Sequence, residues 1–351
     1  MRATEEQAAV RKAAARLAEL LGASKSEVRL RPDRRVPGAD AVIEVAGATF
    51  VVEFKASAGA ALISIAIEQV KRYASALGRR AVPLVVVPFM GPTGRRRCEE
   101  AQVAWCDLSG NARIVAPGIR VLIEGQPNQF KSRGRPSSAF APKSARIARW
   151  LLMHPGQPAS QREIAQATGM DEGFTSRIVS RLEEAELLAR EPDGGIRLRD
   201  PDLLLDAWRE DYDFSKHHIF RGHMAARSGE EALHLLSDGL RVHGTEHAAT
   251  GLAAAWLLTK LVSFRLVTIY VAELPAPKVL ERLGLREEAR GANVWLAVPK
   301  DEGVFQGSRE IEQVGCVHPV QAYLDLKDQP ERAKEAAERL RAEFLKWSAN
   351  A

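Results

Sequence analysis

The N-terminal region is organised around the segment from Ala41 to Lys55, which reads AVIEVAGATFVVEFK. Apolar residues alternate along its two arms, and Gly47 stands between them. Alternation of this kind is typical of β-strands, whose successive side chains point to opposite faces of a sheet. The sequence therefore predicts a β-hairpin with its turn at Gly47.

The second arm of this hairpin ends in Glu53-Phe54-Lys55, and Asp40 directly precedes the first arm. Because residues two apart in a strand share a face, Glu53 and Lys55 point the same way while Phe54 faces the core. Asp40, at the base of the first arm, can lie beside Glu53 across the hairpin. Two carboxylates and a lysine at the end of a sheet suit a hard divalent cation and a phosphate.

Further elements are predicted on both sides of the hairpin. The segment from Ala8 to Leu21 has the spacing of an amphipathic helix and stops at Gly22. A second helix is expected from Leu62 to Leu77, and the apolar run from Ala81 to Val87 has the length of a buried strand. Shorter strands are predicted at residues 103–108, 112–115 and 120–124. This order predicts a mixed α/β domain around a small sheet.

Polar segments outside the hairpin have two interpretations each. Asp107, Ser109 and Asn111 surround Gly110, which favours a tight turn over a role at an active edge. The basic run at residues 29–35 and the arginines at 95–97 are either phosphate contacts or solvated loops.

The spacing of Asp40 and Glu53-x-Lys55 on a hairpin followed by a helix resembles the PD-(D/E)XK nuclease superfamily. The helix adds Gln69-Val-Lys-Arg-Tyr73, which is similar to the QxxxY element of the RecB-like branch. Gln69 and Tyr73 are four residues apart, so they lie on one face of that helix. The resemblance covers most of residues 1–128.

This resemblance implies hydrolysis of a DNA phosphodiester that depends on Mg²⁺ or Mn²⁺. Asp40 and Glu53, with the carbonyl of Phe54, would hold the metal ion. Lys55 would orient the attacking water or stabilise the developing negative charge. The remaining two residues, Gln69 and Tyr73, would position the nucleic-acid strand or the catalytic groups.

Alternatives stay open within this domain. Glu19 on the first helix is a candidate for the extra acid that some members of the superfamily use. Pro32-Asp33 is a literal Pro-Asp whose distance to Glu53 also fits the superfamily, although Asp40 is preferred because it abuts the strand. Folds of this kind also serve as inert DNA-binding platforms, so an active nuclease is one of two interpretations.

The segment from Asn128 to Pro142 is rich in Ser, Pro, Gly and basic residues and has no periodicity. It predicts a linker between domains. Three of its residues are candidates for contacts along a DNA backbone: Lys131, Arg133 and Arg135.

The next segment, residues 143–208, predicts three helices and a hairpin. Lys143 to Met153 is amphipathic, and Ser160 with Glu163 forms a capping box that starts the second helix. Gly169 makes the turn to a third helix capped by Asp171, and a hairpin follows at residues 188–198. Two helices joined by a short turn with glycine, followed by a hairpin, resemble a winged helix-turn-helix domain.

In such a domain the third helix would enter the major groove of DNA, and the wing would meet phosphates. The candidates on the helix are Thr175, Ser176, Arg177, Ser180 and Arg181, and those on the wing are Arg190, Arg197 and Arg199. The competing interpretation is a winged helix that contacts another protein.

The C-terminal segment predicts a second α/β domain. Histidines gather between His217 and His247 without the spacing of a tight metal pair, so surface or hydrogen-bonding roles are favoured. Helices are expected at residues 245–258, 319–326 and 329–347, and strands at 266–271, 294–298 and 311–317.

Residues 143–347 resemble AbiEi-like antitoxins, through the segments at 293–298, 301–304 and 317–326 and the closing PERAKEAAERLR. In that family a winged helix precedes a domain related to nucleotidyltransferases, and the protein represses a toxin operon. A working nucleotidyltransferase would need a Gly-Ser turn followed by a DxD carboxylate pair, and this segment does not contain that arrangement. We therefore expect this domain to catalyse nothing.

The composition is that of an ordinary globular protein, with 351 residues, 46% hydrophobic and 27% charged. A formal charge of +5 is compatible with nucleic acid as a partner, and three scattered cysteines fit a reducing cytoplasm. The apolar run from Leu252 to Ala272 is interrupted by Lys260 and Arg265, so no membrane span is expected.

The sequence thus predicts an α/β multidomain protein. Residues 1–128 form a PD-(D/E)XK nuclease-like domain, 129–142 a basic linker, 143–208 a winged helix-turn-helix, and 209–351 a nucleotidyltransferase-like α/β domain. The main interpretation is a Mg²⁺-dependent DNA nuclease, in defence against phage or mobile elements, and the alternative is an AbiEi-like repressor or antitoxin. DNA is the expected partner, with a cognate toxin or defence protein and a homodimer as further candidates.

Overall fold

The structure is a computed structural model and describes residues 2–31, 38–78, 80–130, 139–260, 263–288 and 290–347. The chain divides into two compact units, with the boundary between residues 136 and 137. Within the described residues, no helix is long and apolar enough to cross a bilayer.

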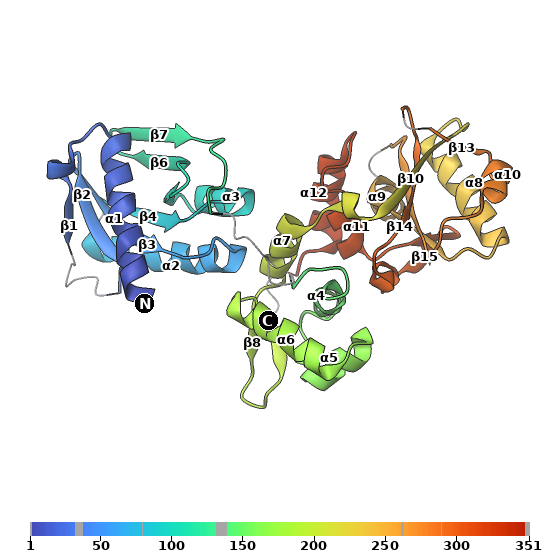
Figure 1. The fold of residues 1–351 in the computed structure, drawn as a ribbon, viewed down its shortest axis with the longest axis horizontal. Helices are drawn as coiled ribbons and strands as arrows, with labels where there is room; N and C mark the ends of the chain where they lie inside the picture. The colour runs from blue at the N-terminus through green and yellow to red at the C-terminus, as the bar shows by residue number, and fades with distance from the viewer. Residues whose placement is uncertain are drawn as a thin grey trace. The chain divides into compact units, whose positions relative to one another are not determined.

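The first unit is built on a seven-stranded sheet in which neighbours in the sequence are neighbours in space (Figure 1). Strands β3, β4 and β5 run parallel, and the other pairs are antiparallel. The strands are β1 (Arg29–Arg31), β2 (Ala41–Val45), β3 (Ala48–Phe54), β4 (Ala81–Val87), β5 (Ala104–Asp107), β6 (Ala112–Ala116) and β7 (Ile119–Ile123).

The predicted hairpin is confirmed as the pair β2 and β3, in which Ala41 lies opposite Val52. Its turn consists of Ala46 and Gly47, with φ angles of 49° and 75°. Two consecutive positive φ angles match the twist of the flanking strands, which is why the turn is tight.

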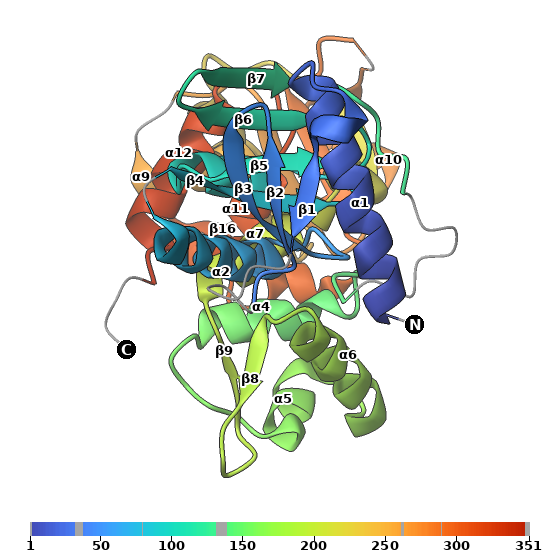
Figure 2. The ribbon, with the colours of Figure 1, turned by 90° about the vertical axis from the view of Figure 1, so that its left-hand side faces the viewer.

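Helices cover both faces of this sheet (Figures 1 and 2). Helix α1 (Arg2–Leu20) packs with Phe50 and Val52 on one face. Helix α2 (Ala60–Leu77) packs with Val51 and Trp105 on the other, where α3 (Pro92–Glu100) also lies. The short helix η1 (Lys25–Glu27) follows α1. Because β3 alternates, Glu53 faces α2 while Phe54 faces α1.

The second unit begins with three helices and a short hairpin, as the sequence predicts. These are α4 (Ala145–Met153), α5 (Gln161–Thr168), α6 (Glu172–Glu184), β8 (Leu188–Arg190) and β9 (Ile196–Leu198). The capping box of Ser160 and Glu163 is present, and Gly169 ends α5 with a φ of 64°. Figure 2 shows the hairpin next to α5 and α6. This region is a winged helix.

The rest of the unit is a mixed seven-stranded sheet with the strand order β13-β10-β14-β12-β11-β16-β15. The strands are β10 (His218–Met224), β11 (His247–Thr250), β12 (Val267–Val271), β13 (Leu285–Glu287), β14 (Val294–Val298), β15 (Arg309–Ile311) and β16 (Val314–Cys316). The helices are α7 (Pro201–Asp211), η2 (Phe214–Lys216), α8 (Gly229–Val242), α9 (Gly251–Thr259), α10 (Pro277–Arg282), η3 (Glu302–Phe305), α11 (Pro319–Asp325) and α12 (Ala333–Phe344).

Two of the predicted elements in this sheet were wrong. The helix expected at residues 245–258 starts only at Gly251, because His247–Thr250 form β11, which pairs with β12 and β16. The strand expected at residues 311–317 is a hairpin, since Glu312 and Gln313 both have positive φ angles and form its turn. Pairing in the sheet overrides the local preference of an alanine-rich segment for helix.

Candidate functional site

The end of β3 brings three of the predicted site residues together. The Lys55 ammonium donates to Glu53 Oε1 at 2.7 Å and to Gln69 Oε1 at 2.9 Å. Glu53 is buried, and Lys55 and Gln69 are partly buried. The contact arises because Glu53 and Lys55 share the face of the sheet that α2 covers, and α2 carries Gln69.

Asp40 lies at the same end of the hairpin. Its Oδ2 accepts a hydrogen bond of 2.7 Å from the backbone N–H of Phe54, the residue next to Glu53. The carboxylate is therefore fixed by the main chain of β3, as the spacing of the two acids predicts. Asp33, the alternative acid, lies outside the described residues.

Tyr73 is one turn beyond Gln69 on α2 and packs against the segment that leads into Asp40. A Cβ added to Gly38 would lie 2.5 Å from the Tyr73 hydroxyl oxygen, so a larger residue at this position would require the tyrosine ring to shift. Arg72 stacks on this ring at 5.3 Å. Tyr73 thus helps to place the chain that carries Asp40.

Glu19 is not brought to this site. It lies on α1, which covers the opposite face of the sheet from Glu53, and it is bound by Arg16 at 2.6 Å. The described residues contain no group of three or more His, Cys, Asp and Glu side chains arranged to hold a metal ion. The oxygen donors at the end of β3 are therefore two carboxylates, Asp40 and Glu53, and the Phe54 carbonyl.

The polar segment after β5 is a structural turn, as expected. Asp107 is buried and accepts hydrogen bonds from the backbone N–H groups of Met90 and Asn111 at 3.0 and 2.8 Å. The side chain of Asn111 in turn bonds both the N–H and the carbonyl of Gln126. These contacts satisfy the buried polar groups and hold three segments together.

On the winged helix, α6 exposes only part of the predicted contact set. Arg177 is exposed, and Ser176, Ser180 and Arg181 are half-buried. Thr175 is completely buried, so its assignment to the outer face was wrong. It shares a stripe with Ile178, Val179 and Leu182, which are three, four and seven residues further on and form the inner face of the helix.

Each arginine predicted on the wing is paired with a nearby acid. Arg190 binds Glu183 at 2.7 Å, Arg199 binds Glu186 at 2.9 Å, and Arg197 binds Glu191. Exposed pairs of this kind are weak, so a phosphate can compete for these cations. Lys131, Arg133 and Arg135 lie outside the described residues.

Behind the winged helix lies a buried polar cluster that the sequence did not reveal. Asp325 of α11 is fully buried and accepts hydrogen bonds from Thr250 at 2.5 Å, Gln321 at 2.8 Å and Tyr270 at 3.0 Å, and also from Tyr212. Burial raises the pKa of the Asp325 carboxyl to about 6, although its hydrogen bonds oppose this shift. We call these five residues the Asp325 cluster.

His217 lies beside this cluster, with its Nε2 3.2 Å from the hydroxyls of both Tyr212 and Tyr270. Burial lowers the pKa of this histidine to about 4, so its ring is neutral near pH 7. The expectation of a hydrogen-bonding histidine is confirmed at this position. No single motif marks the cluster, because its members come from elements far apart in the sequence.

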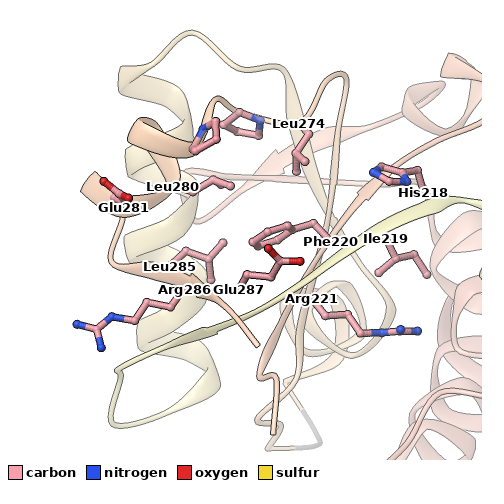
Figure 3. Close-up of a pocket in the computed structure, with 12 residues that line it drawn as sticks. His218, Ile219, Phe220, Arg221, Leu274, Leu280, Glu281, Leu285, Arg286 and Glu287 are labelled. Carbon is pink, nitrogen blue, oxygen red and sulfur yellow. The ribbon is translucent and has the colours of Figure 1, made fainter. Parts of the chain in front are cut away.

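A groove of about 740 Å³ opens at the edge of the second sheet, between β10, α10 and β13 (Figure 3). Phe220, Leu280 and Leu285 form its apolar lining, while Arg221 and Arg286 extend away from it. No sequence pattern indicates this groove, since its residues occupy ordinary amphipathic positions.

Two family models match the second unit. Residues 140–196 match the MarR family, and residues 197–346 match a family described as transcriptional regulator, AbiEi antitoxin, type IV toxin–antitoxin system. A winged-helix region similar to the MarR family is thus followed directly by a region similar to the AbiEi family, which we call the AbiEi-type region. No curated protein and no solved structure matches the chain.

Proposed function

We propose that the chain is a DNA-binding transcriptional regulator of the AbiEi antitoxin type. The observation that carries the proposal is the order of the two matched regions, in which a winged helix directly precedes an AbiEi-type region. In this proposal residues 143–208 bind an operator, and residues 209–351 are a non-catalytic domain that serves regulation.

The winged helix would read DNA through α6 and hold it through the wing. Arg177 is the exposed cation on α6 and suits a base edge in the major groove. The three wing arginines would exchange their weak carboxylate partners for phosphates. Base contacts then give specificity, and phosphate contacts give affinity and register.

A reporter driven by the region upstream of the chain's own gene tests this proposal in cells. Wild type should repress the reporter, and Arg177→Ala should relieve repression. Arg339→Ala is the control, because Arg339 is also an exposed helical arginine but lies on α12, where it is paired with Glu343. The proposal fails if wild type does not repress, or if both variants repress equally.

The antitoxin part of the proposal requires a toxin. If a neighbouring gene encodes one, its expression should arrest growth and co-expression of this chain should restore growth. If co-expression of Arg177→Ala also restores growth, residues outside the DNA-binding helix are responsible for protection against the toxin. Failure of wild type to restore growth would leave only the regulator role.

A second candidate function is a metal-dependent nuclease in the first unit. The contact of Lys55 with both Glu53 and Gln69, beside Asp40, favours it. Asp40 and Glu53 fit Mg²⁺ in donor chemistry, since this ion is bound through one or two carboxylates and keeps several waters. When bound, the ion would polarise a phosphate and lower the pKa of water.

In this second candidate, Lys55 would move its ammonium from Glu53 toward the developing negative charge, and Gln69 would hold the lysine in position. Purified protein should cut plasmid or single-stranded DNA with Mg²⁺ or Mn²⁺, and Asp40→Ala and Glu53→Ala should abolish cutting. Glu44→Ala is the control on the same hairpin. Binding of Mg²⁺ by calorimetry gives a readout that does not depend on cleavage. Absence of cutting by wild type would end this candidate.

A further inference from the structure

Helix α4 joins the winged helix to the AbiEi-type region through two arginines that differ in how well their charges are compensated. Arg146 forms a two-pronged contact with Asp301, with Nε to Oδ1 at 2.7 Å and Nη2 to Oδ2 at 2.8 Å. It also reaches Glu302 at 3.2 Å. This is a charge-assisted pair of favourable geometry.

Arg149 lies one turn further along α4 and is almost completely buried, at 3% exposure. Its Nη2 donates to the neutral Gln321 amide oxygen at 2.6 Å, and its guanidinium stacks on Trp208 at 5.2 Å. Within the described residues, its Nε and Nη1 are buried and have no hydrogen-bond partner. Burial accordingly lowers the pKa of Arg149.

The compensating charge for Arg149 is indirect. The same Gln321 amide that accepts from Arg149 donates to Asp325 at 2.8 Å, so a neutral group stands between the two charges. On the other side lies Gly303 of η3, where an added Cβ would be 3.0 Å from Arg149 Nη1 and 2.6 Å from Asp301 Oδ1. The guanidinium is thus enclosed without a direct carboxylate partner.

A buried cation held in this way costs free energy, because the loss of its hydration is only partly offset by one amide and one aromatic ring. We propose that Arg149 and the Asp325 cluster form a latch between the winged helix and the AbiEi-type region. The latch keeps the docked and undocked arrangements of these two parts close in free energy. The latch loosens when the negative charge of Asp325 is lost.

A role of the latch in regulation rests on the proposed DNA-binding function. Because the docked and undocked arrangements are close in free energy, binding of a partner to the AbiEi-type region can shift docking and so change the position of α6. The partner does not need to contact DNA. The latch itself does not depend on DNA, so it is testable when the proposed function fails.

Whether substitution of Arg149 tightens or loosens docking distinguishes a latch from an ordinary structural contact. Arg149→Met removes the charge and keeps an unbranched apolar side chain against Trp208, so docking should become tighter by about tenfold. The matched control is Arg146→Met, one turn away. It removes a cation that is paired with Asp301 and leaves that carboxylate without its Arg146 contact. That variant should loosen docking by about tenfold.

Hydrogen exchange of the α4 amides in the full chain measures this docking, because exchange reports the opened population. We expect slower exchange for Arg149→Met and faster exchange for Arg146→Met. Asp325→Asn should speed exchange, and adding Arg149→Met to Asp325→Asn should restore it. Arg149→Leu serves as a second apolar variant if the methionine variant does not fold.

Faster or unchanged exchange in the apolar Arg149 variants would overturn the latch. Unchanged exchange in Asp325→Asn would overturn the role of its charge. DNA affinity, measured by fluorescence anisotropy on the same variants, then reports whether the latch regulates binding. A wild type that binds no DNA would contradict the proposed function and leave the exchange result valid.

Discussion

At position 175 a threonine hydroxyl is fully buried and, among the described residues, has no hydrogen-bond partner. A buried hydroxyl without a partner costs free energy that an apolar side chain of the same shape avoids. Thr175→Val should therefore raise the free energy of unfolding by about 1 kcal/mol, measured by urea denaturation. DNA affinity should be unchanged, and a loss of stability would place the hydroxyl in a contact that the structure does not show.

The contact of Lys55 with Glu53 predicts a stability effect that is separate from any catalysis. Because Glu53 is 4% exposed, Lys55→Met removes one cation from a buried carboxylate and should lower the free energy of unfolding by about 2 kcal/mol. Glu53→Gln added to Lys55→Met should recover most of that loss. Urea denaturation of both single variants and the double variant measures the coupling, and additive losses would contradict it.

Among the elements, the turn between β15 and β16 consists of two residues that adopt positive φ angles only at a cost in free energy. Glu312 and Gln313 have φ angles of 51° and 64°, a region that Asn and Gly adopt at lower cost. Glu312→Asn with Gln313→Gly should raise the melting temperature, with a gain of about 1 kcal/mol. Thermal unfolding tests this, and a lower melting temperature would show that the glutamate and glutamine side chains hold the hairpin.

The same turn shows why some elements could not be predicted from the sequence. The β2–β3 hairpin and the α5 cap were predictable, because Gly47 and the Ser160–Glu163 pair carry local signals. Residues 312 and 313 carry no turn signal, so the sequence pattern predicts one strand where the structure has a hairpin. An element can be predicted from the sequence where its own residues carry the turn or capping signal.

The polar sites also differ in how far they can be predicted from the sequence. Asp40, Glu53, Lys55 and Gln69 could be placed together, because a hairpin and the next helix lie close in the sequence. The Asp325 cluster could not, since Tyr212, Thr250 and Asp325 approach only through the packing of distant elements. The prediction for Thr175 was wrong because the helical period places this residue on the buried stripe of α6, with Ile178, Val179 and Leu182.

At the scale of the whole molecule, buried histidines predict sensitivity to acid. Burial lowers the pKa of both His217 and His318 to about 4, against 6.5 for an ordinary histidine. The unfolded chain therefore binds more protons than the folded chain between pH 6.5 and 4, and stability falls as the pH drops through this window. Asp325 opposes this, since its raised pKa lets the folded chain hold a proton between about pH 6 and 3.8.

Two histidines outweigh one aspartate, so the net effect below pH 6 is about 1.4 kcal/mol of stability lost per pH unit. Urea denaturation at pH 7, 6 and 5 measures this slope. The double variant His217→Gln with His318→Gln removes both lowered histidine pKa values and leaves the raised pKa of Asp325 as the main contribution between pH 7 and 5, so the slope should reverse. An unchanged slope in that variant would assign the acid sensitivity to other groups.

In the proposed regulator, the winged helix recognises a specific DNA sequence through α6. Fluorescence anisotropy of the full chain on its own upstream region, against unrelated DNA of equal length and at fixed salt, tests it most directly. We predict at least about 1,000-fold tighter binding to the upstream region, and a loss of about 10- to 100-fold for Arg177→Ala. Equal binding of wild type to both DNAs, or an unchanged affinity for Arg177→Ala, would contradict the claim.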